Sequence, residues 1–213
     1  MKSKFLFVQF WVFSLLISCN TNQSEKRSDS GDKQDGVKTE KTFVPLNVDE
    51  KWEENPFTWF KGQGLLLAVG DSVSNNAMTI GWGSLGNIWQ KIGANTVTVY
   101  VAEARYTYEF MEKYDYFTVM AFDRDDARIL GYMGTHSGRD GDKAAHLGLH
   151  TLYTENGTPY YEEAQLVLEC HIIYKAPFLT EGMCEDVRKF YENFDAGVHH
   201  MYIGNIVGAW IKE

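Results

Sequence analysis

The sequence has few of the residues that hold metal ions or cross-link a small fold. It contains only three cysteines and four prolines in 213 residues, and no C-x-x-C or H-E-x-x-H spacing occurs. His199 and His200 are neighbours that would point to opposite faces of a strand, which is poor geometry for a shared ion. No metal site is therefore predicted. Cys170 lies in a strand-like run and Cys184 in a loop, and their pairing in an oxidising compartment stays open.

The sequence also lacks an excess of positive charge, since its net charge is −9 at pH 7. This balance argues against nucleic acid and against an anionic membrane surface as binding partners. Any anionic ligand must then be held by a few local basic groups or by backbone amides.

No apolar run is long enough to span a bilayer, which takes roughly 20 residues in a helix. The longest candidate, from Phe5 to Ile17, follows Lys2 and Lys4 and is typical of a secretory signal. Its ending, Leu16-Ile17-Ser18-Cys19, resembles a bacterial lipobox, in which the cysteine is lipidated and becomes the new N-terminus. Residues 1–19 are therefore predicted to be a lipoprotein signal peptide, and the protein an exported, membrane-anchored lipoprotein of a bacterial cell envelope. An ordinary signal peptide or an uncleaved anchor is the alternative.

Residues 20–42 contain almost no aliphatic side chains and mix charges of both signs with Ser, Gly and Gln. Such a segment cannot bury enough apolar surface to offset its ordering entropy, so we expect a disordered polar tether. The folded domain is predicted to span 43–213.

Within this domain, β-type runs outnumber helical ones. Strands are expected over 64–69, 78–82, 96–101, 116–122, 160–161, 164–174 and 201–211. Only short helices are expected, at 108–113, 125–130 and 185–193. The pattern lacks the regular alternation of strands with long helices that a doubly wound sheet needs. We therefore predict a mainly β fold, an antiparallel barrel with a few short peripheral helices.

A literal G-x-G-x-x-G occurs at Gly81, Gly83 and Gly86, with Glu103 about 20 residues later. This spacing matches the dinucleotide-binding fingerprint, which requires a helix opening at its last glycine. Too few residues separate Gly86 from Gly93 for that helix. The dinucleotide interpretation is therefore rejected, and Gly83 and Gly86 are interpreted as turn residues.

Three clusters could carry chemistry. The segment 75–86 combines small residues with Asn76, Thr79 and Trp82, and could place a flat ligand close to the backbone. The segment 103–108 combines Arg105 and Thr107 with a helix start, which suits a phosphate. The segment 135–143 is the densest polar loop. From residue types alone, each cluster could equally be a capped turn, a capped helix or a charged surface loop.

Taken in order, five motifs resemble the flavin reductase-like, flavoredoxin-type family. They are NAMTIGWG at 76–83, RYTYEFMEK at 105–113, SGRDGDK at 137–143, EEAQLVLEC at 162–170 and HMYIG at 200–204. Together they extend over nearly all of 43–213.

The resemblance implies an FMN-binding split β-barrel that forms a homodimer. It assigns the flavin ring and ribityl chain to Asn76, Met78, Thr79, Gly81 and Trp82. It assigns the phosphate to Arg105 and Thr107 with Tyr106 between them, and completion of the site to Ser137, Gly138, Arg139 and Lys143. Met133, His200 and Asn205 depart from the family pattern, so the implied substrate side is less defined than the FMN side.

The implied function is an FMN-binding oxidoreductase that passes hydride or electrons through flavin to a small molecule or a redox protein, with no dedicated catalytic residue assigned. Export would separate such a protein from nicotinamide nucleotides. A membrane-tethered FMN electron carrier without NAD(P)H turnover is therefore the alternative, and a barrel that has lost flavin is a third possibility.

Overall fold

The computed structural model describes residues 42–47, 56–62, 64–89 and 95–213. All of them belong to one compact unit, residues 40–213. The predicted signal peptide at 1–19, its lipidated Cys19 and the tether up to residue 41 lie outside the described residues. In the described part of the chain, no helix combines the length and apolarity that a membrane span needs.

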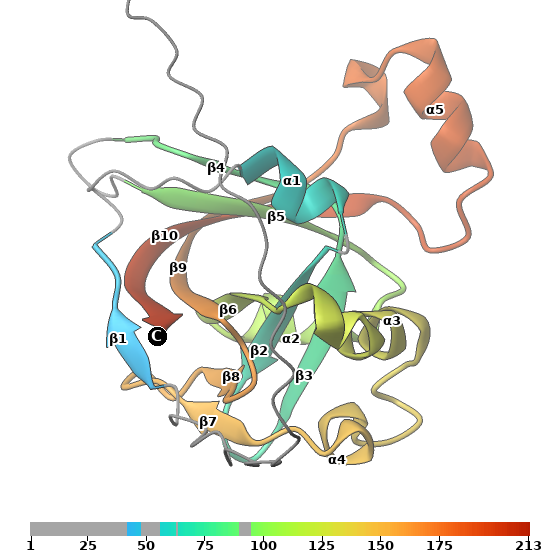
Figure 1. Ribbon diagram of the computed structural model, residues 1–213. Coiled ribbons are helices and arrows are strands. Elements are labelled where there is room, and N and C mark those ends of the chain that lie inside the picture. The colour runs from blue at the N-terminus through green and yellow to red at the C-terminus, as the bar shows by residue number, and fades with distance from the viewer. Residues whose placement is uncertain (1–41, 48–55, 63, 90–94) are drawn as a thin grey trace, which may run out of the picture. The chain divides into compact units, whose positions relative to one another are not determined.

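The domain is built around one curved antiparallel sheet (Figure 1). Its strand order is β3-β2-β6-β9-β10-β5-β4, with β1 pairing to β10. A separate hairpin joins β7 to β8. The strands are β1 (Phe43–Pro45), β2 (Leu65–Gly70), β3 (Asn75–Ile80), β4 (Gly83–Gly86), β5 (Thr96–Ala102), β6 (Tyr116–Ala121), β7 (Thr151–Tyr153), β8 (Pro159–Tyr161), β9 (Leu166–Pro177) and β10 (His199–Lys212). The predicted mainly β, antiparallel fold is confirmed.

The helices are short, as predicted. They are α1 (Pro56–Lys61), α2 (Tyr106–Lys113), α3 (Ala127–Thr135), α4 (Lys143–Leu147) and α5 (Glu185–Glu192), with 3₁₀ turns at Arg124–Asp126 and Thr180–Gly182. The helix expected at 125–130 is a 3₁₀ turn followed by the longer α3. The sequence prediction missed α4. Asp142 is the N-cap residue of this helix, and its side chain accepts a hydrogen bond from the Ala145 amide at 3.0 Å.

Strand β2 explains how the domain has two cores. All of its side chains are buried because successive residues point to opposite faces. Leu65, Leu67 and Val69 pack inside the barrel with Phe110 and Met111 of α2, among others. Leu66 and Ala68 pack on the outer face, under α3 and α4. The continuous apolar run is therefore a central strand covered on both sides.

The interpretation of Gly83 and Gly86 as turn residues is wrong. Both lie in β4, which pairs antiparallel with β5 in the register Gly83↔Val99 and Gly86↔Thr96. A Cβ on Gly83 would collide with the Phe60 ring and lie 2.8 Å from the Thr98 carbonyl oxygen, so close packing requires glycine there. Rejection of the dinucleotide fingerprint is confirmed, because Gly86 ends a strand and residues 87–89 are not helical.

The two described cysteines are both free thiols. Cys170 is fully buried in β9, where burial raises the pKa of its thiol well above the usual value. Cys184 is exposed at the start of α5. The sequence left open whether Cys170 and Cys184 pair, and in the structure they form no disulfide.

Candidate functional site

A cavity of about 290 Å³ lies where the starts of β3 and α2 meet the end of α3. The predicted site residues that line it are Asn76, Met78, Arg105, Tyr106, Thr107, Ser137, Gly138, Arg139 and Lys143. These residues come from three separate segments of the chain, and the fold brings them to one place. Their contact with a flavin stays a prediction.

Asn76 and Thr107 join two of these segments. The Asn76 side-chain amide donates to the Thr107 hydroxyl at 2.7 Å, and both side chains are buried. Gly138 packs directly on this pair, because a Cβ there would collide with the Asn76 amide oxygen and lie 3.1 Å from the Tyr106 ring. The third segment is therefore held against the other two at a position that only glycine fits.

The start of α2 opens into the cavity. Arg105 is its N-cap residue, yet its side chain caps no amide of the helix. The Arg105 amide donates to Ala102 and the Tyr108 amide donates to Arg105, which leaves the amides of Tyr106 and Thr107 without a backbone partner among the described residues. Amides at a helix start carry partial positive charge and favour an anion. Arg105 is exposed and lines the same cavity, to which its guanidinium adds a full charge.

Lys143 is a buried cation at the cavity wall, only 7% exposed. Its Nζ donates to the carbonyl oxygens of Met133 and His136, both at 3.1 Å, and thereby caps the C-terminal end of α3. Burial lowers the pKa of Lys143 to about 8. Since neither acceptor carries a full charge, an anion in the cavity would stabilise the ammonium form.

Arg139 has protein partners of its own. Its Nη2 pairs with Glu109 at 2.5 Å, its Nη1 donates to Ala104 at 3.2 Å, and its guanidinium lies 4.8 Å from the Tyr106 ring centroid. Glu109 was not among the predicted residues. Its charge offsets that of Arg139, so Arg105 and Lys143 are left as the cations of the cavity without a carboxylate partner in the described part.

Three predicted residues lie away from the cavity lining. Thr79 donates to the Leu130 carbonyl oxygen at 2.6 Å and so ties β3 to α3. Gly81 follows the end of β3, near the Phe60 carbonyl oxygen. Trp82 is 45% exposed, and its ring packs against His199 at 4.5 Å and Phe190 at 5.9 Å. This ring contact joins the end of β3 to the α5 segment.

Five further lining residues had been assigned no role in the site, namely Ala104, Met133, Gly134, Thr135 and His136. Ala104, Thr135 and His136 lie within the candidate clusters 103–108 and 135–143, and Met133 and Gly134 directly precede the second cluster, but their side chains gave no distinct signal. The His136 ring stacks on Tyr132 at 3.8 Å, and His146 of α4 stacks on the same Tyr132 ring at 4.4 Å. His136 is thus the outer member of a stack that joins α3 to α4.

His199 and His200 have separate environments, as the strand geometry predicts. His199 packs among aromatic rings and accepts or donates a hydrogen bond with Tyr191 at 3.0 Å, depending on its tautomer. Burial and the nearby Arg105 lower its pKa. His200 instead lies 3.0 Å from a carboxylate oxygen of Glu103. No cluster of three His, Cys, Asp or Glu side chains suited to a metal ion occurs in the described residues.

A model of the flavin reductase-like domain matches residues 65–213, which include every wall of the cavity. The chain belongs to this family. The match starts at β2 and covers all of the strands that carry the predicted motifs. Membership of the flavin reductase-like family assigns the chain to flavin-binding redox proteins.

Solved structures share the fold at low sequence identity. Flavoredoxin from Methanosarcina acetivorans has a TM-score of 0.55 and 23% identity, over 70% of this chain and 68% of that chain. Flavoredoxin of Desulfovibrio vulgaris has a TM-score of 0.55 and 22% identity, over 80% of this chain and 78% of that chain. The FMN-binding domain of a flavin reductase-like enzyme from Shewanella baltica has a TM-score of 0.55 and 14% identity, over 81% of this chain and 78% of that chain. No curated protein matches the chain. At these identities the structures establish the fold alone.

Proposed function

We propose that this protein binds FMN in the cavity at the start of α2 and acts as a flavin-dependent oxidoreductase. The observation that carries the proposal is the meeting of Arg105, the α2 amides and the buried Lys143 at one polar cavity in an acidic protein. Membership of the flavin reductase-like family supports it, as does FMN binding in the similar domain from Shewanella baltica.

The donors present fit a phosphate monoester. A phosphate offers three acceptor oxygens and close to two negative charges at pH 7. The site supplies a guanidinium, an ammonium and the amides of Tyr106 and Thr107, with the hydroxyl of Ser137 nearby. These are charge-assisted donors of the kind that bind phosphate in other proteins. Met78 and Met133 supply an apolar part of the wall.

Bound FMN would supply the electron or hydride transfer, and the protein would supply binding and orientation. Arg105 and Lys143 would anchor the anionic end of the ligand. Asn76, held through Thr107, would keep its carbonyl oxygen and the adjoining backbone in one orientation. The redox partner is then a small molecule or a protein that reaches the open side of the site.

The first test is purification of the chain with added FMN, followed by measurement of flavin absorbance and affinity. We expect a yellow protein, and Arg105→Ala to weaken FMN affinity by about 1–3 kcal/mol through loss of a charge-assisted bond. Arg128→Ala is the matched control, since Arg128 lies on α3 away from the cavity lining. Failure of the protein to bind FMN would overturn the assignment of the cofactor. Equal FMN affinity in the Arg105 variant and the unchanged protein would overturn the placement of the phosphate at Arg105.

A second candidate is a membrane-tethered FMN electron carrier that does not turn over NAD(P)H. The lipobox-like sequence ending at Cys19 favours it, because nicotinamide nucleotides are scarce outside the cytoplasm. Anaerobic mixing with NADH or NADPH separates the two. Bleaching of the flavin supports a reductase, and unchanged absorbance together with reduction by dithionite supports a carrier. Labelling with a radioactive fatty acid, lost in Cys19→Ser, tests the lipoprotein anchor.

We also propose that the protein is a homodimer. Helix α5, which projects away from the sheet in Figure 1, supports this. None of its residues is buried, although Val187 and Phe190 are apolar. Light scattering coupled to gel filtration tests it, and a monomer at micromolar concentration would exclude it.

A further inference from the structure

A second and larger cavity, of about 970 Å³, lies at the opposite end of the barrel from the FMN candidate site. It opens where β2 begins, β6 ends, β9 begins and β10 ends. The register places Ala121, Leu166 and Ile211 side by side on three of these strands. Asn76 of the first cavity pairs instead with Val69, at the other end of β2. The two cavities share no lining residue.

The wall of this cavity is mostly apolar. Leu65 and Leu166 are almost fully buried at its inner side, and Ile211, Ala121 and Trp59 extend the surface. Its size suits a ligand of drug-like dimensions, for which cavities of roughly 300–1,000 Å³ are typical. An apolar wall of this extent favours a hydrocarbon or another flat or extended apolar group.

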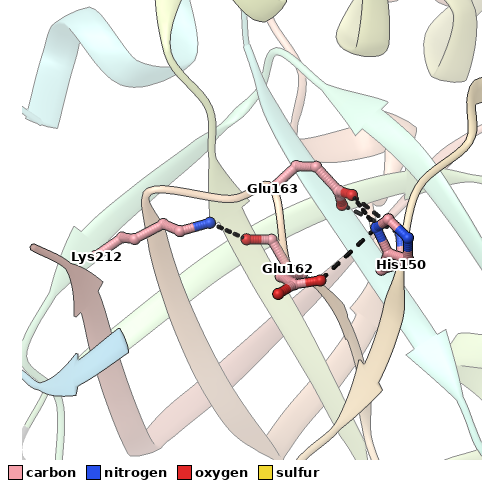
Figure 2. A network of polar contacts seen from close by, with 4 residues as sticks. All are labelled: His150, Glu162, Glu163 and Lys212. Carbon is pink, nitrogen blue, oxygen red and sulfur yellow. Dashed lines mark hydrogen bonds and ion pairs between the residues drawn. The ribbon is translucent and has the colours of Figure 1, made fainter. Parts of the chain in front are cut away.

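The rim of the same cavity is cationic. Lys61, Arg124 and Lys212 lie on it, against one acidic residue, Asp123. In the described part of the chain, the side chains of Lys61 and Arg124 form no ion pair and no hydrogen bond. Lys212 donates to the Glu162 carbonyl oxygen, which carries no full charge (Figure 2). A protein with a net charge of −9 thus presents three cations around an apolar cavity that, among the described residues, has a single carboxylate in its lining, that of Asp123.

We propose that this cavity binds a medium-chain alkyl carboxylate. The alkyl chain lies against Leu65, Leu166 and Ile211, and the carboxylate lies between Lys61 and Arg124. The apolar wall supplies affinity in proportion to the buried length, and the cations select a carboxylate over a neutral head group. This site is independent of the FMN site and of the function proposed for it.

Calorimetric titration of the full chain with octanoate, decanoate and laurate, each below its micelle concentration, tests the proposal. We expect one saturable site, with affinity rising about fifteenfold for each two added carbons, since each buried CH₂ contributes about fourfold. Dodecanol should bind at least tenfold more weakly than laurate. FMN absorbance should be unchanged at saturation, because the cavities are separate.

Variants decide whether the rim cations are responsible. Lys61→Gln and Arg124→Gln should each weaken laurate binding by about three- to tenfold, whereas Arg128→Gln, a charge change of the same size on α3, should leave it unchanged. Absence of saturable binding, equal binding of dodecanol, or an equal loss in Arg128→Gln would each overturn the proposal. Both test variants change exposed side chains, so folding should be retained and is checked by circular dichroism.

Discussion

Asn76 on β3 and Thr107 on α2 are joined by a buried hydrogen bond of 2.7 Å across the floor of the FMN candidate site. They are 31 residues apart in the chain. The bond holds the start of β3 against the start of α2, and Gly138 packs on the same amide from a third segment. The geometry of the site therefore depends on this three-way contact.

Gly138→Ala should weaken FMN binding by at least tenfold. The added Cβ would collide with the Asn76 amide oxygen. Because the contact is close-packed, either the Asn76 side chain or the segment that carries Gly138 must move to relieve the collision. Flavin titration of the purified variant measures the effect. Gly131→Ala is the matched control, because its Cβ meets open space on α3 and it should retain affinity while gaining about 0.5–1 kcal/mol of helix stability. Equal affinity in both variants would contradict the three-way contact.

FMN affinity should fall as the pH rises above 8. The pKa of Lys143 is about 8 in the free protein because its ammonium group is buried, and a bound phosphate would raise it. Binding then favours the protonated amine, so affinity is constant below pH 8 and decreases above it, by up to tenfold for each unit of pKa increase. The phosphate itself is already a dianion in this range.

Fluorescence titration of FMN between pH 7 and 9.5 measures this dependence, and Lys143→Met should flatten it while lowering affinity throughout. A wild-type profile that is flat over this range would contradict contact between Lys143 and the phosphate. A slope that persists in the variant would assign the titration to another group.

Gly204→Ala should destabilise the fold by about 1–3 kcal/mol, the usual cost of overpacking a core. Gly204 lies in β10 beside a register irregularity, and a Cβ there would be 2.6 Å from the Phe117 ring and 2.7 Å from the Cys170 Cβ. Urea unfolding measures the loss. Gly182→Ala, where a Cβ meets open space, should change stability by less than about 0.5 kcal/mol.

His150 should titrate above the usual histidine pKa, and Glu163→Gln should lower it. The Nδ1 of His150 lies 2.8 Å from a Glu163 carboxylate oxygen and 3.6 Å from one of Glu162 (Figure 2). The hydrogen bond to Glu163 and its charge favour the imidazolium form and raise the pKa. Proton NMR of the imidazole resonances, assigned with His150→Gln, measures the change. Glu155→Gln should leave the His150 pKa unchanged.

Much of the fold could be predicted because strand signals are local. The apolar run that forms β2 and the β-branched run that forms β5 identify their strands without neighbours. Pairing partners are not local, and the assignment of Gly83 and Gly86 to a turn was wrong for that reason. Only contact with β5 and the Phe60 ring turns this glycine-containing segment into a strand.

The candidate site was predictable in part for a related reason. Residue types identified Arg105, Thr107 and Lys143 as candidates for anion binding, but could not give their partners. The structure adds Glu109, which pairs with Arg139, and it places Lys143 under the end of α3. It also packs Trp82 on His199 and Phe190, away from the cavity lining.

The sequence by itself determined the predominance of strands, the short helices, the net negative charge and the ordered motifs of the flavin reductase-like family. These properties depend on residue type and short-range order. Only the tertiary structure decided which cations meet at one cavity and which are neutralised by a carboxylate. Those outcomes depend on contacts between segments such as β3, α2 and the loop after α3. The free energy of such contacts depends on how deeply the side chains are buried and on the distances between their atoms, and both are fixed only when the chain has folded.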